Sequence, residues 1–182
     1  VEHLFYLQVD NPLAPIGDPE LIGYQLLAKS ELTSLAVAKQ SPQDKLGNFV
    51  TIDDRLHVIE YSDFPDDVAD RREEEDEDKS ADDDACGLAF WAGSVAIHVF
   101  DVPFLERSLQ LKDSLPFHIA HKKAEVVDDA GNLVEPKKPN ALKFERFIFD
   151  LLPHARRPIV IEYAEEESFA PLKNAPGAPK DT

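Results

Sequence analysis

The sequence is poor in cysteine, in basic residues and in long apolar runs. Cys86 is the single cysteine among 182 residues, which excludes an intramolecular disulfide framework and suits a reducing, cytoplasmic compartment. Nineteen Lys and Arg stand against 36 Asp and Glu, so the net charge is −17. Nucleic-acid binding needs a basic stripe, and none is visible. No apolar run approaches the roughly 20 residues that span a bilayer, so we expect no membrane partner.

Several motifs of chemistry are also missing. The sequence has no Gly-x-Ser-x-Gly nucleophile motif, no Gly-rich phosphate loop and no cysteine spacing for zinc. His118 and His121 are three residues apart, but neither has a carboxylate at ligand spacing, which favours a surface or structural role over a metal site. Methionine is absent and the sequence opens on a strand pattern, so we expect a piece of a longer protein.

Strand and helix patterns alternate along the chain. Asp18 and Pro19 predict a helix start that continues to about Lys29, and Asp101 predicts another. This alternation predicts one α/β domain with a mixed, mainly parallel sheet plus β-hairpins. The predicted strands are 4–9, 35–38, 88–100 and 158–163, and the predicted hairpins are 47–52 with 56–61 and 124–127 with 133–134.

Residues 66–84 are almost wholly charged. Such a run cannot bury enough apolar area to offset its ordering entropy, and it predicts a disordered acidic loop. A binding role for this loop, with a metal or a basic partner, is the less favoured alternative.

The stretch 139–150 predicts a helix. Asn140 could cap its first turn, the apolar residues Phe144, Phe147 and Ile148 recur at helical spacing, and Pro153 would end it. Lys143 on this helix and Lys173 on the loop 169–175 would then form an anion site, although the pattern alone favours solvated lysines.

Two positions have a ligand interpretation and a structural one. Asp10 follows a strand and could contact magnesium or a ribose hydroxyl, but Asp-Asn-Pro is also an ordinary turn sequence. Gly93 lies inside a strand pattern, which indicates either a close approach of the backbone to a ligand or a packing glycine.

Five motifs together resemble the UDP-N-acetylhexosamine (UDP-GlcNAc) pyrophosphorylases, within the wider UDP-sugar pyrophosphorylase family. They occur in that family's order and span nearly the whole chain. The motifs are LQVDNPL at 7–13, VIEYS at 58–62, FWAGSVAIH at 90–98, PNALKFERFIFD at 139–150 and FAPLKNA at 169–175.

The resemblance implies the central to C-terminal part, 1–182, of a Rossmann-like nucleotidyltransferase domain of the glycosyltransferase-A type. It implies a Mg²⁺-dependent reaction in which UTP and a sugar 1-phosphate give a UDP-sugar and pyrophosphate. It assigns Asp10 to the metal, and Lys143 and Lys173 to the phosphates as catalytic groups. The residues that it assigns to substrate binding are Gly47, Glu60, Gly93, Ser94, Asn140, Phe147 and Phe149.

Two departures from the family pattern limit this assignment. The family's Gly-rich loop, the lysine after it and the uracil-reading residues are absent, so we expect this chain alone not to turn over UTP. Trp91-Ala92-Gly93-Ser94 stands where the family has Asn-Ala-Gly-Asn, which leaves the sugar open. N-acetylglucosamine 1-phosphate is favoured; the alternatives are a UDP-glucose or broad-specificity enzyme, or a non-catalytic module that binds sugar nucleotides or a partner.

Overall fold

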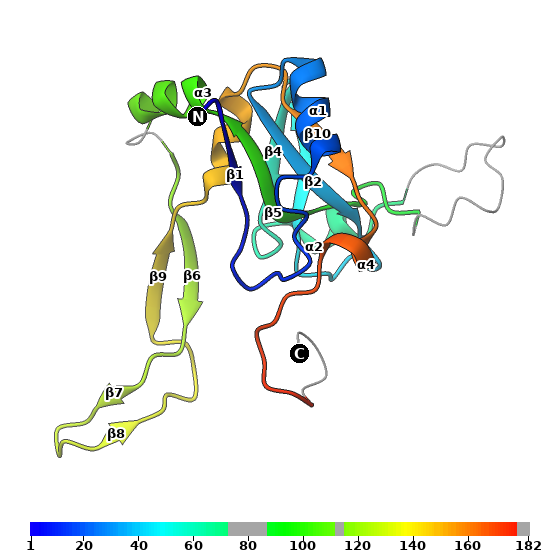
Figure 1. Cartoon of the computed structure of the whole chain (residues 1–182). Coiled ribbons are helices and arrows are strands. Elements are labelled where there is room, and N and C mark those ends of the chain that lie inside the picture. Colours follow the sequence, from blue (N-terminus) through cyan, green and yellow to red (C-terminus); the bar gives the residue numbers. More distant parts are fainter. Residues whose placement is uncertain (73–86, 112–114, 178–182) are drawn as a thin grey trace.

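The computed structural model describes residues 1–72, 87–111 and 115–177, and it is built around a mixed six-stranded sheet (Figure 1). The strand order is β10-β2-β5-β3-β4, and β1 also pairs with β5. The strands are β1 (His3–Tyr6), β2 (Leu32–Ala38), β3 (Gly47–Ile52), β4 (Arg55–Ile59), β5 (Ala92–Asp101) and β10 (Ile159–Glu162).

The sheet is mixed, as predicted, but the prediction that it is mainly parallel is wrong. Among the described strands only β10 and β2 pair in parallel, whereas β5 runs antiparallel to β1, β2 and β3. Strands β3 and β4 form the predicted hairpin. Its turn residues Asp53 and Asp54 both have positive φ, of 48° and 59°, as a tight hairpin turn requires.

Strand β5 organises the sheet because its two edges are used differently. Strand β2 pairs along nearly its whole length, with a register shift where the single residue Leu35 of β2 lies opposite residues 95–97 of β5. Ala96 lies in this bulge with a φ of 55°, a conformation that costs a non-glycine residue energy. On the other edge, β1 pairs with residues 98–101 and β3 with 93–94. The sheet therefore forks beside residues 95–97.

Short helices cover both faces of the sheet. Helix α1 (Pro19–Ala28) begins at Asp18, whose carboxylate accepts hydrogen bonds from the backbone N–H groups of Glu20 and Leu21, as predicted. Helix α3 (Val102–Ser108) follows Asp101, but the Asp101 side chain makes no capping bond. The remaining helical segments are α2 (Asp66–Ala69), η1 (Leu109–Leu111), η2 (Ile148–His154) and α4 (Glu165–Ser168).

Each face of the sheet has its own apolar core. On one face, Leu21 of α1 packs over Leu35, Val37, Ile97 and neighbouring residues. On the other face, the α3 and η2 side chains pack over β2 and β5; this core comprises Leu32, Ala36, Phe49, Val58, Phe100, Phe104, Phe149, Leu151 and Leu152. Burial on both faces explains why the central strands read as nearly continuous apolar runs.

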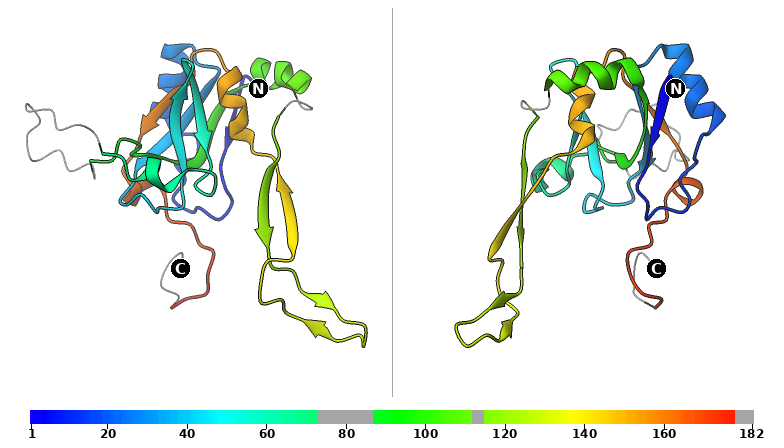
Figure 2. Two further views of the ribbon diagram at one scale, coloured as in Figure 1. Left: turned by 180° about the vertical axis from the view of Figure 1, so that it is seen from behind. Right: turned by 60° about the vertical axis from the view of Figure 1, so that its left-hand side comes forward.

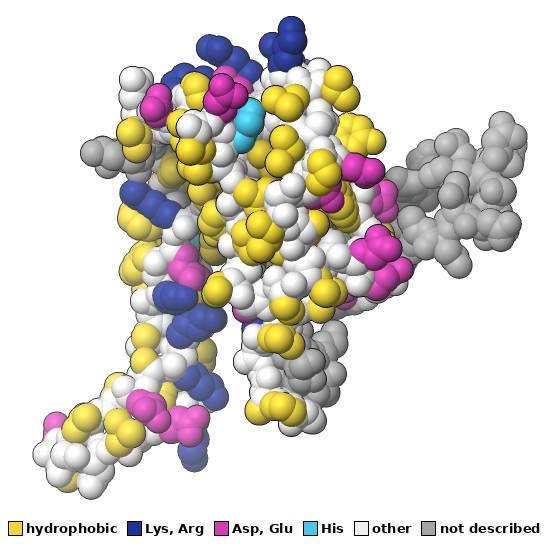
Figure 3. All heavy atoms as spheres, in the orientation of Figure 1, with side chains coloured by type: hydrophobic (Ala, Val, Ile, Leu, Met, Phe, Trp, Pro, Cys, Tyr) yellow, Lys and Arg dark blue, Asp and Glu magenta, His cyan; other side chains and the backbone are white. Residues whose placement is uncertain are grey.

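An extended arm projects from this body (Figures 1 and 2). Its base is the antiparallel pair β6 (His118–Lys122) and β9 (Ala141–Glu145). Its tip is the pair β7 (Val126–Val127) and β8 (Leu133–Val134), which confirms the second predicted hairpin. Exposed Lys side chains line the arm (Figure 3), although the chain as a whole is strongly acidic.

The arm contradicts the predicted helix over 139–150. Residues 141–145 form β9, and only 148–154 are helical, as the 3₁₀ segment η2. Phe144 lies opposite Ile119 and Leu142 opposite His121, so the apolar residues follow the period of a strand. Asn140 caps no helix: its side chain accepts from the Ala124 N–H and donates to the Ala124 carbonyl, at 2.8 and 3.0 Å.

Two other predictions are only partly covered by the described residues. The acidic range 66–84, predicted to be disordered, begins with α2, and residues 73–86 lie outside the described residues. A short bridge between Arg72 and Leu88 flanks that gap. Within the described part of the chain, no helix has the length and apolar character needed to cross a membrane.

Candidate functional site

Asp10 and Lys173, far apart in sequence, lie next to each other. The buried Asn11 side chain donates to the Ser168 carbonyl at 2.8 Å and accepts from the Ala170 N–H at 3.0 Å. The Asp10 carbonyl accepts from the Leu172 N–H at 2.7 Å. These three bonds hold the loop after α4 against the turn after β1. They place the Lys173 ammonium 3.6 Å from an Asp10 carboxylate oxygen.

A second group of predicted residues meets where β3, β4 and β5 adjoin. Gly47 pairs with Ser94, and Gly93 pairs with Asn48. A Cβ on Gly47 would lie 2.6 Å from the Val58 side chain, so only glycine fits there without displacement. Glu60 follows β4 directly, one residue after the Ile59 that pairs with Asn48. The sheet thus gathers Gly47, Gly93, Ser94 and Glu60.

The interpretation of Gly93 as a packing glycine has direct support. A Cβ at Gly93 would approach the Leu46 side chain to 2.6 Å and the Lys39 side chain to 3.2 Å. Lys39 itself is buried, and its ammonium donates to the Asn48 side-chain oxygen at 2.7 Å. The sequence pattern gives no sign of this buried lysine, because a lysine at the end of a strand is usually solvated.

Glu60 lies in an acidic setting. Burial of this carboxyl and repulsion from Asp63 raise the pKa of Glu60 above its ordinary value, and the nearby Glu145 adds to the rise. His118 acts in the opposite direction. These electrostatic neighbours show that the start of the arm lies close to the loop after β4.

Phe147 and Phe149 are stacked, with ring centroids 4.8 Å apart and an interplanar angle of 17°. The His118 ring lies 4.7 Å from Phe147, and its two nitrogens lie 3.1 Å from Asp63 and 3.0 Å from Asp150. The sequence favoured a surface or structural role for His118 over a metal site, but it did not identify these partners. Its carboxylate partners are 55 and 32 residues away, so no local spacing could reveal them.

The two predicted catalytic lysines, Lys143 and Lys173, lie in different parts of the structure and have different ion-pair partners. Lys143 is exposed on β9 and forms an ion pair with Glu145 on the same face of that strand. Figures 1 and 2 show β9 on the arm, apart from the segment that follows α4 and contains residue 173. Asn140 directly precedes β9, and its side chain bonds to Ala124 of the arm, so Lys143 and Asn140 both belong to the arm.

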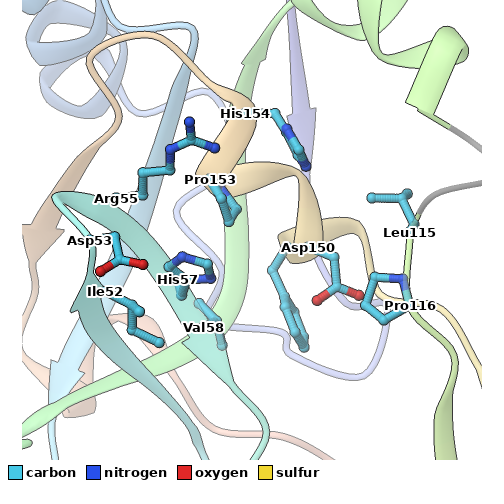
Figure 4. A pocket seen from close by; sticks show the side chains of 11 residues that line it. Ile52, Asp53, Arg55, His57, Val58, Leu115, Pro116, Asp150, Pro153 and His154 are labelled. Carbon is cyan, nitrogen blue, oxygen red and sulfur yellow. The ribbon is translucent and has the colours of Figure 1, made fainter.

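A cavity of about 540 Å³ lies between β4, η2 and residues 115–116 (Figure 4). Phe149 and Asp150 contribute to its wall, together with Arg55, His57 and His154. Neither Asp10, Glu60 nor either predicted lysine lines it. The cavity therefore lies beside the predicted site rather than within it.

The Asp10 carboxylate could be one ligand of a cation whose other ligands do not come from the described residues. The Asp10 Oδ1 atom is buried and has no hydrogen-bond partner. In the described ranges, no cluster of three or more His, Cys, Asp or Glu side chains could hold a metal. Magnesium is commonly held by one or two carboxylates together with substrate phosphates. Asp10 suits that arrangement and no fully protein-made metal site.

Comparison with curated proteins found relatives that align with the whole chain. The chain is 34% identical over 183 residues to UDP-N-acetylhexosamine pyrophosphorylase-like protein 1 of Xenopus tropicalis, covering all of this chain and 34% of that protein. It is 33% identical over 187 residues to UDP-N-acetylglucosamine pyrophosphorylase of Saccharomyces cerevisiae, covering all of this chain and 37% of the relative. The chain thus spans about a third of the length of these curated relatives. No family model matches the sequence.

The fold also has a solved counterpart. A crystal structure of a candidate UDP-N-acetylglucosamine pyrophosphorylase from Entamoeba histolytica superimposes with a TM-score of 0.81 at 28% identity. The match covers all of this chain and 42% of that one. This likeness confirms the predicted fold, part of a nucleotidyltransferase domain with a mixed sheet.

Proposed function

Since this chain belongs to the UDP-N-acetylhexosamine pyrophosphorylase family, we propose that it forms part of an enzyme that makes a UDP-sugar. UTP and a sugar 1-phosphate are the proposed substrates. An oxygen of the sugar phosphate attacks the α-phosphorus of UTP, the bond from that phosphorus to the bridging oxygen breaks, and pyrophosphate leaves. The chain spans about a third of its relatives, so the rest of the site would come from polypeptide outside these residues.

The observation that carries this proposal is the junction of Asp10 and Lys173. The reaction concentrates negative charge on phosphate oxygens, and a positioned ammonium stabilises that charge in the transition state. Lys173 stands on a loop that three long-range hydrogen bonds hold in place. Its 3.6 Å contact with Asp10 places the ammonium beside that carboxylate before a phosphate arrives.

Magnesium, when bound by Asp10 and substrate phosphates, would neutralise phosphate charge and orient the reacting groups. The orphaned Asp10 Oδ1 atom supports this role. Asp10 would also hold the Lys173 ammonium nearby in the absence of nucleotide. Lys143, exposed beside Glu145, would need to exchange that partner for a phosphate to contribute.

The sugar end would lie where Glu60, Gly47 and Ser94 meet. Glu60 can accept hydrogen bonds from sugar hydroxyls, and the stacked Phe147 and Phe149 offer an apolar wall. We propose N-acetylglucosamine 1-phosphate as the sugar substrate, because the relatives named above carry N-acetylhexosamine or N-acetylglucosamine in their names. The single cysteine supports a cytoplasmic location.

The test is an assay of a protein of the relatives' length that contains this chain. Purified protein is given UTP, Mg²⁺ and either N-acetylglucosamine 1-phosphate or glucose 1-phosphate, and pyrophosphate release is followed. We expect faster release with the N-acetylated substrate. Faster turnover of glucose 1-phosphate would refute the proposed sugar, and no release with any sugar 1-phosphate would refute the reaction and favour a binding module.

A further inference from the structure

His118 joins three segments that are distant in sequence. It stands at the start of β6, and its ring nitrogens lie 3.1 Å from Asp63 Oδ2 and 3.0 Å from Asp150 Oδ2. Asp63 belongs to the loop after β4, and Asp150 belongs to η2. The side chains of His118 and Asp150 are mostly buried, with 19% and 10% exposure. The imidazole therefore ties the base of the arm to the loop that carries Glu60.

The geometry requires a charged imidazole. A carboxylate only accepts hydrogen bonds, so a ring with a carboxylate at each nitrogen must carry a proton on both. Partial burial of the ring works against the charge, but the hydrogen bonds to Asp63 and Asp150 outweigh it and raise the pKa of His118 above its ordinary value. A neutral ring would leave one nitrogen lone pair facing a carboxylate.

The same ring supports the aromatic pair. His118 lies 4.7 Å from Phe147 and 6.2 Å from Phe149, measured between ring centroids. The two phenylalanines stack on each other. Asp150 directly follows Phe149, so its bond to His118 fixes the backbone that presents the second ring. The charge of His118 also acts on Glu60.

We propose that His118 is a positioning residue that holds Phe147 and Phe149 against the Glu60 loop in the geometry that receives the sugar 1-phosphate. This inference rests on the proposed function, in which Glu60 and the two phenylalanines contact the sugar. His118 acts through these residues and does not touch the reacting phosphorus. Its loss should therefore weaken sugar-phosphate binding and leave UTP binding intact.

The ion pairs of His118 with Asp63 and Asp150 make the proposed binding of sugar 1-phosphate depend on pH. Because its pKa is raised, the doubly protonated ring is fully present below its ordinary pKa near 6.5 and is lost as the pH rises through the folded value. The charged groups that face it are Glu60, Asp63, Glu145 and Asp150. These four groups are carboxyls, and the Arg146 guanidinium lies over the ring of the neighbouring Phe117, 4.1 Å from its centroid. The KM for the sugar 1-phosphate should rise at alkaline pH.

The test measures KM for sugar 1-phosphate and for UTP across pH in a protein of the relatives' length. We expect His118→Gln to raise the sugar-phosphate KM about tenfold at neutral pH with little change in the UTP KM. His118→Arg keeps a permanent charge and two donors, so it should restore much of the binding and abolish the alkaline rise. His121→Gln is the matched control, because His121 is exposed on the opposite face of the same strand.

Asp63→Asn supplies an independent variant, since Asp63 is 46% exposed and its loss should spare the fold. It removes one carboxylate, so the alkaline rise in KM should move to lower pH. Suppose that the wild-type protein is active and that both His118→Gln and Asp63→Asn keep its sugar-phosphate KM and its pH profile. This result would overturn the inference about His118 and leave the proposed function standing. Absence of wild-type turnover would overturn the proposed function and this inference with it.

Discussion

Replacing Asn11 with alanine should loosen the junction that holds Lys173 in place. The Asn11 side chain is 3% exposed and bonds across the chain to the Ser168 carbonyl and the Ala170 N–H, over 157 and 159 residues. Alanine removes both bonds at once. The loop after α4 would then be held to the turn after β1 by the Leu172 N–H bond to the Asp10 carbonyl.

The structure sets the size of the effect. Ser168 is fully buried, so its carbonyl loses its partner where water cannot replace it, at about 1–3 kcal/mol. Ala170 is exposed, so water can satisfy its N–H, and that bond contributes about 0.5–1.5 kcal/mol. We expect Asn11→Ala to lower the free energy of unfolding by about 2–4 kcal/mol.

Urea unfolding of the 182-residue chain, followed by circular dichroism, measures this loss. Asn140→Ala is the matched control, because Asn140 makes the same kind of paired bonds, to Ala124, on an exposed part of the arm. The control should cost less than about 1 kcal/mol. Equal losses in the two variants would refute the argument that burial of the Ser168 carbonyl makes the Asn11 bonds strong.

Three further variants test other parts of the site and the fold. Lys173→Ala, in a protein of the relatives' length, should slow turnover by about two orders of magnitude or more; unchanged kcat would make Lys173 a surface residue. Gly47→Ala places a Cβ 2.6 Å from the Val58 side chain and should lower the free energy of unfolding in urea by about 1–3 kcal/mol. An unchanged midpoint would show that the strands shift to accommodate the methyl group. The hydrogen bond from Arg107 is the main cause that lowers the pKa of Glu31. The stabilisation of the fold by ionised Glu31 is therefore present above pH 4.5, and it is lost as the pH falls through the lowered pKa of Glu31. Glu31→Gln should flatten the acid side of the stability curve, and an unchanged acid limb would contradict this.

Local signals in the sequence located several elements correctly. Asp18 followed by Pro19 predicted the start of α1, and the capping bonds are present. Two strand patterns around Asp53 and Asp54 predicted the β3–β4 hairpin. These features depend on residues within a few positions of each other, so composition and spacing are sufficient to predict them.

The arm shows why the same reasoning was wrong over 139–150. Phe144, Phe147 and Ile148 satisfy a helical period, but Leu142 and Phe144 also satisfy a period of two. The choice is made by β6, whose residues Ile119 and His121 pair with them. That partner lies more than 20 residues away, and a short window around the segment cannot contain it. Tertiary pairing therefore overrode a plausible local pattern.

The site depends on such distant contacts even more strongly. Asp10 and Lys173 were separate candidates in the sequence, which the family resemblance assigned to one site, and their proximity arises from bonds that Asn11 makes to the opposite end of the chain. A surface or structural role was predicted for His118, but its partners Asp63 and Asp150 were not. No periodicity in the sequence encodes either arrangement.

The fork in the sheet explains how one strand serves both halves of the proposed site. The bulge at Ala96 divides β5 into an upper part that pairs with β1 and a lower part that pairs with β3. Strand β1 leads into the turn with Asp10, and β3 opens with Gly47 beside Ser94. The two proposed halves, for phosphate and for sugar, therefore branch from the same edge of β5. A straight β5 would pair continuously with one neighbour and leave no separation between them.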